Sequence, residues 1–171
     1  MLKFFKDLLG GAKAPLLDTP ASSPRHMAEL VEFLILLQAP GTAPASGKKG
    51  NLLRLATSLS QDPYCLGYMM GMFDSLCQQW EVPASEQRVI TGSACTLLFR
   101  DLLENVCDLR HAATIEDAAF NGARQHASDP AFQRGKFDGC SELTRYMATK
   151  KRDDMPLRLH VRLKELLAQA A

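Results

Sequence analysis

Residues 62–80 read DPYCLGYMMGMFDSLCQQW, and this stretch decides the fold. Asp62 is a favourable N-cap, and Pro63 follows at the first helical position, where its missing N–H costs nothing. Three small residues then recur at every fourth position and share one helix face: Gly67, Gly71 and Ser75. Glycine inside a helix costs about 1 kcal/mol relative to alanine. The stripe therefore predicts that the backbone of a second helix comes close.

Residues 129–147 repeat this design. Asp129 and Pro130 open the stretch, and the small residues Ala131, Gly135 and Gly139 form its stripe. A shift of 64 residues places the GMFD sequence at 71–74 on the GKFD sequence at 135–138. One hypothesis is a duplication, in which helices 62–80 and 84–109 correspond to helices 129–149 and 156–169. The alternative is that the two helices are not copies, and that each carries a glycine stripe because each packs closely against another helix.

The rest of the chain is also predicted to be helical. No stretch alternates between apolar and polar residues with period two over five residues, so we expect no strand. The architecture predicted is an all-α bundle of six or seven helices in residues 24–171, preceded by an amphipathic arm and a Pro/Gly-rich linker in residues 1–23. The further helices are expected from 24 to about 38, from an N-cap at Asn51, from Ser85 to about Leu109, from Thr114 to about Ala127, and from Pro156 to about Gln169.

Composition is that of an ordinary globular protein. The chain has 171 residues, of which 46% are hydrophobic and 23% charged, and this length suits one domain or one domain with a tail. The net charge of +1 is unevenly distributed. Residues 1–57 carry 7 basic and 4 acidic side chains, residues 58–143 carry 6 and 12, and residues 144–171 carry 7 and 3. The basic ends indicate either an anionic partner or packing beside the acidic middle.

The five cysteines indicate a reducing compartment. Their number is odd and none forms a C-x-x-C pair, so we expect free thiols and a cytoplasmic protein of bacterial type. No stretch approaches the roughly 20 apolar residues of a membrane-spanning helix, and the N-terminus does not read as a secretory signal.

The N-terminal arm is the first candidate for an interaction. Residues 2–9, LKFFKDLL, are predicted to form a short helix with five apolar side chains gathered toward one face: Leu2, Phe4, Phe5, Leu8 and Leu9. So short a helix is marginal alone in water and needs a surface. Three surfaces stay open: an anionic membrane, which would place the protein peripherally at the inner membrane, a sister subunit or partner groove, and its own bundle.

Three carboxylates are candidates for ligand or metal binding. Asp74 and Asp138 occupy equivalent places in the two GxFD sequences, and Glu142 follows Asp138 by one turn. Such a group can bind a cation or share a proton. The alternative is a pair of surface aspartates that each follow a buried phenylalanine.

A second possible ligand set comprises Glu104, Cys107, Asp108 and His111, at spacings that share one face if the helix continues. The expected helix end near Leu109 argues against it, because a histidine there is accounted for by the terminal carbonyls. No Walker loop, G-x-G-x-x-G, G-x-S-x-G or H-E-x-x-H occurs in the sequence. We therefore predict no cofactor and no metal.

The C-terminal part contains a basic segment, residues 145–164. Its candidate phosphate contacts are Lys150, Lys151, Arg152, Arg158 and Arg162. The segment contains one aromatic residue, Tyr146, and acidic residues interrupt it, so base stacking is unsupported. A solvated basic edge is the favoured interpretation.

The leading functional hypothesis is a non-enzymatic interaction or regulatory protein that acts through protein contacts, either with a protein partner or as a homo-oligomer. It follows from the lack of a cofactor signature and of a nucleophile paired with a base. The first alternative is an enzyme or ligand binder that uses Asp74, Asp138 and Glu142. The second is nucleic-acid binding through residues 145–164.

Overall fold

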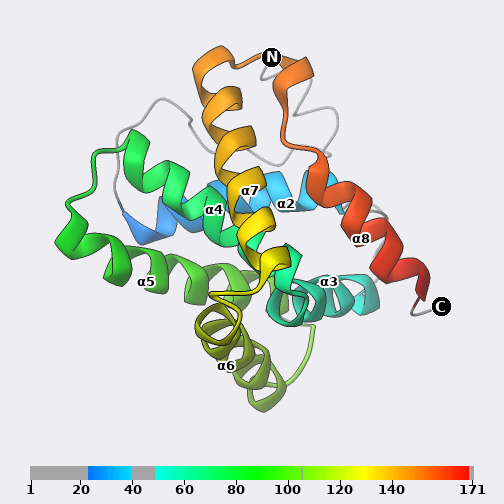
Figure 1. The fold of residues 1–171 in the computed structure, drawn as a ribbon. Helices are drawn as coiled ribbons and strands as arrows, with labels where there is room; N and C mark the ends of the chain where they lie inside the picture. The colour runs from blue at the N-terminus through cyan, green and yellow to red at the C-terminus, as the bar shows by residue number, and fades with distance from the viewer. Residues whose placement is uncertain (1–22, 40–48, 105, 170–171) are drawn as a thin grey trace.

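The computed structural model describes residues 23–39, 49–104 and 106–169. This part of the chain is all-α, with seven α-helices, one short 3₁₀ helix and no strand, so the predicted helical bundle is confirmed. The elements are α2 (Pro24–Gln38), α3 (Lys49–Gln61), α4 (Pro63–Gln79), α5 (Ala84–Leu103), α6 (Leu109–Gln125), α7 (Pro130–Thr149), η2 (Arg152–Asp154) and α8 (Arg158–Gln169). Figure 1 shows α4 and α7 crossing near the centre, with α8 along one side.

Helices α4 and α7 pack backbone against backbone. A Cβ atom built on Gly67 or Gly71 would lie 2.1 or 2.0 Å from a carbonyl oxygen of α7, contributed by Phe132 and Lys136 respectively. Two glycines of α7 make the reciprocal contact with the backbone of α4. A Cβ atom built on Gly135 would lie 2.1 Å from the carbonyl oxygen of Tyr64, and one built on Gly139 would lie 2.1 Å from that of Tyr68. Both contact series advance in the same direction along the two helices, so α4 and α7 run parallel. Only glycine allows this approach, because any side chain would occupy the position of a carbonyl oxygen.

Side-chain caps fix where several helices begin. Ser23, Asp62, Asp108 and Asp129 precede α2, α4, α6 and α7, and each side chain accepts a hydrogen bond from a backbone N–H of the first turn. Proline follows the cap of α2, α4 and α7, where its fixed φ suits the first helical position.

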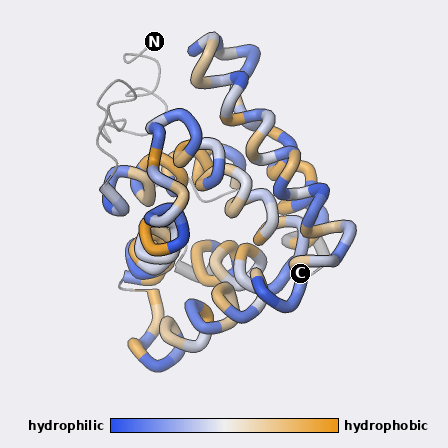
Figure 2. The backbone as a smooth tube through the Cα atoms, turned by 60° about the vertical axis from the view of Figure 1, so that its left-hand side comes forward, coloured by the Kyte–Doolittle hydropathy of each residue, from blue (hydrophilic) through white to orange (hydrophobic). Residues whose placement is uncertain are grey.

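The hydrophobic core is built around α4. The largest fully buried side chains of the core come mainly from α2, α3, α4, α5 and α7, and include Tyr68, Tyr146, Phe73 and Phe99. Helix α2 packs mainly on α5, and α3 on α6 and α4. Figure 2 shows hydrophobic and hydrophilic residues alternating along most helices, as expected for amphipathic helices around one core. None of the described helices is both long enough and apolar enough to span a bilayer.

The helix predicted from Ser85 to about Leu109 ends earlier than expected. Helix α5 ends at Leu103, and Leu109 opens α6. Asp108 caps α6 by accepting a hydrogen bond from the backbone N–H of His111, at 2.8 Å. The Glu104–Asp108–His111 face therefore does not form, and Thr114, which was expected to be the cap, lies inside α6.

Other boundaries shift by a few residues. Asn51 lies inside α3, which begins at Lys49, and α8 begins at Arg158 rather than at Pro156. On α7, Ala131 is exposed, and the backbone of Phe132 makes the contact with Gly67. The predicted N-terminal arm lies outside the described residues.

Candidate functional site

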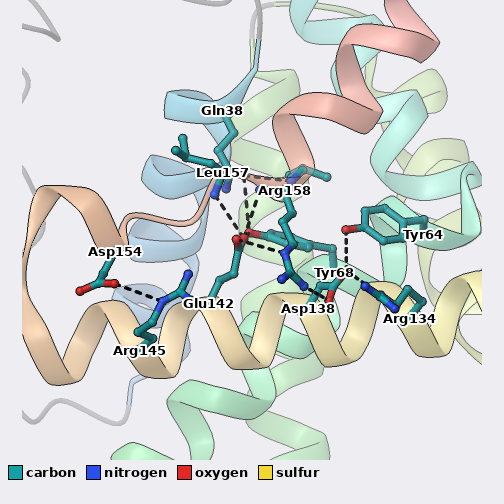
Figure 3. A network of polar contacts seen from close by, with 11 residues as sticks. Gln38, Tyr64, Tyr68, Arg134, Asp138, Glu142, Arg145, Asp154, Leu157 and Arg158 are labelled. Atoms are coloured by element: carbon teal, nitrogen blue, oxygen red, sulfur yellow. Dashed lines mark hydrogen bonds and ion pairs between the residues drawn. The ribbon is translucent and has the colours of Figure 1, made fainter.

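The buried polar cluster of the bundle centres on two carboxylates of α7. Asp138 and Glu142 lie one turn apart and are only 2% and 5% exposed. Burying a charge is costly unless it is paired and hydrogen-bonded. The partners of these two groups therefore define the site (Figure 3).

Asp138 is held by three side chains from three helices. Its Oδ2 accepts hydrogen bonds from the Tyr64 hydroxyl of α4 and from Nε of Arg134 of α7, each at 3.0 Å. Its Oδ1 pairs with Nη1 of Arg158, the first residue of α8. The carboxylate thus connects α4, α7 and α8.

Glu142 is bound by the start of α8. Its Oε2 accepts from the backbone N–H groups of Leu157 and Arg158, at 3.2 and 3.1 Å, and from the Tyr68 hydroxyl at 2.6 Å. Helix N-termini attract anions because their first N–H groups lack helical partners. Glu142 supplies that anion from within the chain.

Gln38 extends the cluster to α2. Its side-chain oxygen accepts from the backbone N–H of Leu159 at 3.1 Å, and its side-chain nitrogen donates to the Leu34 carbonyl at 3.2 Å. The first turn of α8 is therefore fixed by Gln38 of α2 and by Asp138 and Glu142 of α7, as Figure 3 shows.

The tyrosine hydroxyls act as donors in this cluster. Burial, together with hydrogen bonds to Asp138 and Glu142, raises the pKa of Tyr64 and of Tyr68 well above the usual value. Both phenols consequently stay protonated at neutral pH.

A further ion pair joins α8 to the start of α4. Nη2 of Arg162 bonds Oδ2 of Asp62 at 2.6 Å, while Oδ1 of Asp62 caps the helix. Burial works to raise the pKa of Asp62, but the hydrogen bonds from Arg162 and from the Cys65 backbone lower it below its usual value.

The cluster fastens the start of α8 to the bundle and is not an open reactive centre. We call it the latch, and its members are Gln38, Tyr64, Tyr68, Arg134, Asp138, Glu142 and Arg158. Every buried side-chain nitrogen and oxygen atom in the described part of the chain has a hydrogen-bond partner. Glu142 Oε2 already accepts three hydrogen bonds, so its lone pairs are directed at fixed donors. Among the described residues, no three His, Cys, Asp or Glu side chains are grouped so that they could hold a metal ion.

Asp74 does not join the other two carboxylates. It is half-buried and pairs with Nζ of Lys136 at 2.8 Å. Lys136 and Asp138 lie two positions apart on α7 and so project to nearly opposite sides of that helix. The two GxFD sequences also differ in burial, because Phe73 is fully buried whereas Phe137 is 66% exposed. The predicted equivalence of Asp74 and Asp138 is therefore wrong in the folded chain.

A groove opens on the outer side of the latch, between the first half of α7 and helix α8. It has a volume of about 590 Å³ and is lined by Tyr64, Ala131, Arg134, Arg158, Val161, Arg162 and Glu165. Arg134 and Arg158 approach Asp138 from this side, and Val161 is 62% exposed. The groove therefore combines apolar surface with guanidinium groups whose positions are fixed by buried carboxylates.

Two members of the predicted basic segment belong to this groove. Arg158 and Arg162 pair with carboxylates of the bundle, so their charges are partly compensated. Lys150 is the C-cap of α7 with a positive φ of 50°, and Lys151 is exposed in the connection to α8. The side chain of Arg152 lies outside the described set.

Sequence reasoning missed Gln38, Tyr64, Tyr68 and Arg134. A signal for the tyrosines does exist: Tyr64 and Tyr68 are four residues apart, as are Asp138 and Glu142, and each Tyr precedes its carboxylate by 74 residues. Recognising this correspondence requires knowing that α4 and α7 are parallel.

We found no family model that matches the chain, and no significant match among curated proteins or solved structures.

Proposed function

We propose that the protein is a non-enzymatic interaction module that docks a protein partner in the groove between α7 and α8. The observation that supports this proposal is the composition of the groove. Its lining brings together Tyr64, Val161 and three arginines. Tyrosine and arginine are enriched in the energetically dominant parts of protein interfaces, and lysine is depleted.

The surroundings of the groove strengthen the proposal. The described residues include six large hydrophobic side chains that are exposed, and three of them lie on α7 or at the start of α8: Phe137, Leu157 and Val161. Phe137 is one turn from Arg134 on α7, and Val161 is one turn from Arg158 on α8. An exposed apolar side chain therefore lies one turn from an arginine on each of the two helices that border the groove.

The arginines define the chemistry of the partner. Arg134 binds Asp138 through Nε, the inner part of the guanidinium, and its side chain remains 67% exposed. The buried carboxylate fixes this group in place, so little side-chain entropy is lost when a second anion binds. The fitting partner is a protein segment that presents carboxylates beside apolar side chains.

This function is favoured over the carboxylate-based alternatives. An enzyme or cation binder at Asp138 and Glu142 would have to break hydrogen bonds that hold α8 to the bundle. Docking in the groove leaves those bonds in place.

The test is affinity capture with the tagged full chain, comparing the wild type with Val161→Glu. Leu109→Glu is the matched control, because Leu109 is 90% exposed at the start of α6, on an element that does not line the groove. We expect a partner captured by the wild type and by the control but lost with Val161→Glu. The captured protein, once purified, should bind Val161→Glu at least tenfold more weakly in calorimetry. Equal binding of all three chains would refute the proposal.

A further inference from the structure

The three arginines that line the groove differ in how many of their nitrogen atoms are already bonded. Arg162 uses all three. Its Nε and Nη2 donate to the two carboxylate oxygens of Asp62, at 3.4 and 2.6 Å, and its Nη1 donates to Oε2 of Glu165 at 3.2 Å. One guanidinium group therefore meets two carboxylates, and its charge is compensated within the chain.

Arg134 and Arg158 keep nitrogen atoms that are not bonded. Arg134 donates to Asp138 through Nε alone. Arg158 pairs with Asp138 through Nη1, and its Nε lies 3.7 Å from Oε1 of Glu142. Within the described part of the chain, no hydrogen bond or ion pair uses Nη1 or Nη2 of Arg134, or Nη2 of Arg158. These nitrogens are available as donors.

A single buried carboxylate holds these two guanidinium groups beside each other. The Asp138 side chain is only 3% exposed, and its Oδ1 bonds Arg158 of α8 while its Oδ2 bonds Arg134 of α7 (Figure 3). The arginines themselves are 48% and 67% exposed, and both line the groove. Asp138 thus occupies the inner side of the pair and leaves the outer side open to a ligand.

We propose that Arg134 and Arg158 together bind one carboxylate group of the docked protein segment, an inference that rests on the function proposed above. The ligand carboxylate accepts hydrogen bonds from the unused Nη groups, while Asp138 bonds the same two arginines from the buried side. Guanidinium groups suit this role, because their paired N–H donors match the two oxygens of a carboxylate. Arg162 takes no part, since its nitrogens are occupied.

The charges of the surroundings select a carboxylate over a phosphate. Two guanidinium groups share Asp138, and one further negative charge balances the pair. A phosphorylated side chain carries about −1.5 to −2 at neutral pH. The excess would face Glu142, which lies beside Arg158, and Glu165, which lines the groove. Like charges brought together disfavour a partner, so the site favours an aspartate, a glutamate or a C-terminal carboxylate over a phosphate group.

The test uses small probes in place of the partner. N-acetyl-leucine carries one carboxylate beside an apolar side chain, and N-acetyl-leucinamide lacks only the charge. Phenyl phosphate supplies an apolar group with a phosphate that is largely dianionic at about pH 7. Carbon-detected NMR titrations of the full chain follow the arginine side-chain Nε signals. We expect saturable shifts of the Arg134 and Arg158 signals with N-acetyl-leucine, and binding of the other two probes that is at least fivefold weaker.

Arg134→Gln identifies the Arg134 signal and should weaken binding of N-acetyl-leucine about fivefold, the effect of one exposed ion pair of about 1 kcal/mol. Arg145→Gln is the matched control, because Arg145 is also exposed on α7 but does not line the groove, and it should bind the probe like the wild type. Circular dichroism melts verify that both variants fold; Asp138 retains Tyr64 and Arg158 in the first of them.

The inference is overturned if N-acetyl-leucine does not bind the wild type, or if it binds Arg134→Gln equally well. It is also overturned if the amide or phenyl phosphate binds as tightly as N-acetyl-leucine. These titrations contain no partner protein, so their failure is distinct from failure of the proposed function. A partner that is captured by the wild type and lost with Val161→Glu, in a chain that does not bind N-acetyl-leucine, would mean that the groove docks its partner without a carboxylate site.

Discussion

The glycine contacts between α4 and α7 give the sharpest test of the fold. Alanine at position 71 would place its Cβ 2.0 Å from the Lys136 carbonyl oxygen, and alanine at position 135 would place it 2.1 Å from the Tyr64 carbonyl oxygen. Ordinary contact begins near 3.4 Å. The two helices would therefore have to separate locally by about 1 Å or more, and neither carbonyl can move away without disturbing its own helix.

The expected cost follows from overpacking. Forcing extra atoms into a packed interface costs about 1–3 kcal/mol, and here the obstacle is backbone, so we expect about 3 kcal/mol even after the helix-propensity gain of about 1 kcal/mol. For a domain of this size, that is a fall in Tm of about 6–12 °C. The leucine variants Gly71→Leu and Gly135→Leu should lose still more.

Gly92→Ala is the matched control, since a Cβ there would meet only the Phe120 ring, at 3.6 Å. It should be neutral or stabilising by up to about 1 kcal/mol in denaturant unfolding. If Gly71→Ala and Gly135→Ala behaved like this control, the parallel packing of α4 and α7 would be wrong.

Three other predictions address the latch, pH and the N-terminal arm. Tyr68→Phe removes a donor from the buried Glu142 and should cost about 1–3 kcal/mol. Arg145→Gln removes the ion pair between the exposed Arg145 and the partly exposed Asp154, and it should cost less than about 1 kcal/mol in the same unfolding assay. Similar costs for both variants would contradict the latch. Burial and the nearby Asp101 raise the pKa of Glu32 from 4.5 to about 7. The unfolded chain therefore ionises first, and stability should fall by about 1–3 kcal/mol as pH rises from 4.5 through 7; Glu32→Gln should remove this loss at pH 8, and an unchanged pH profile would refute the assignment. Deleting residues 1–12 should leave Tm nearly unchanged and reduce either liposome co-sedimentation or oligomer mass; a large loss of stability in a chain that stays monomeric would place the arm in the core.

The elements were predictable where a local signal exists. Asp-Pro pairs mark the starts of α4 and α7, and the glycine stripes mark their contact, because capping and close backbone approach restrict the residue types allowed. The break between α5 and α6 was missed, because Asp108 reads equally well as a helical surface residue and as a cap. Such a choice depends on tertiary packing, which a single sequence does not display.

The candidate site was predictable only in part, because similar local sequences lie in different surroundings. Asp138 and Glu142 were identified, but as exposed or reactive groups, and Asp74 was grouped with them through the shared GxFD sequence. In the structure, α8 covers the side of α7 that carries Asp138, whereas Asp74 meets Lys136 on the other side. Burial of a carboxylate depends on which helix covers it, and that helix lies 20 residues further along the chain.

The parallel direction of α4 and α7 explains why the latch exists. Each tyrosine of α4 has its carbonyl oxygen against a glycine of α7 and its hydroxyl on a carboxylate of the same helix: Tyr64 on Asp138 and Tyr68 on Glu142. Were the helices antiparallel, the order of the carboxylates relative to the tyrosines would be reversed, and both pairs would not form together. The glycines thus set the register in which the tyrosines donate hydrogen bonds to the buried carboxylates. Those carboxylates hold the first turn of α8, which forms one wall of the proposed docking groove. A bulkier residue at Gly135 or Gly139 should therefore weaken partner binding as well as stability, although neither glycine lines the groove.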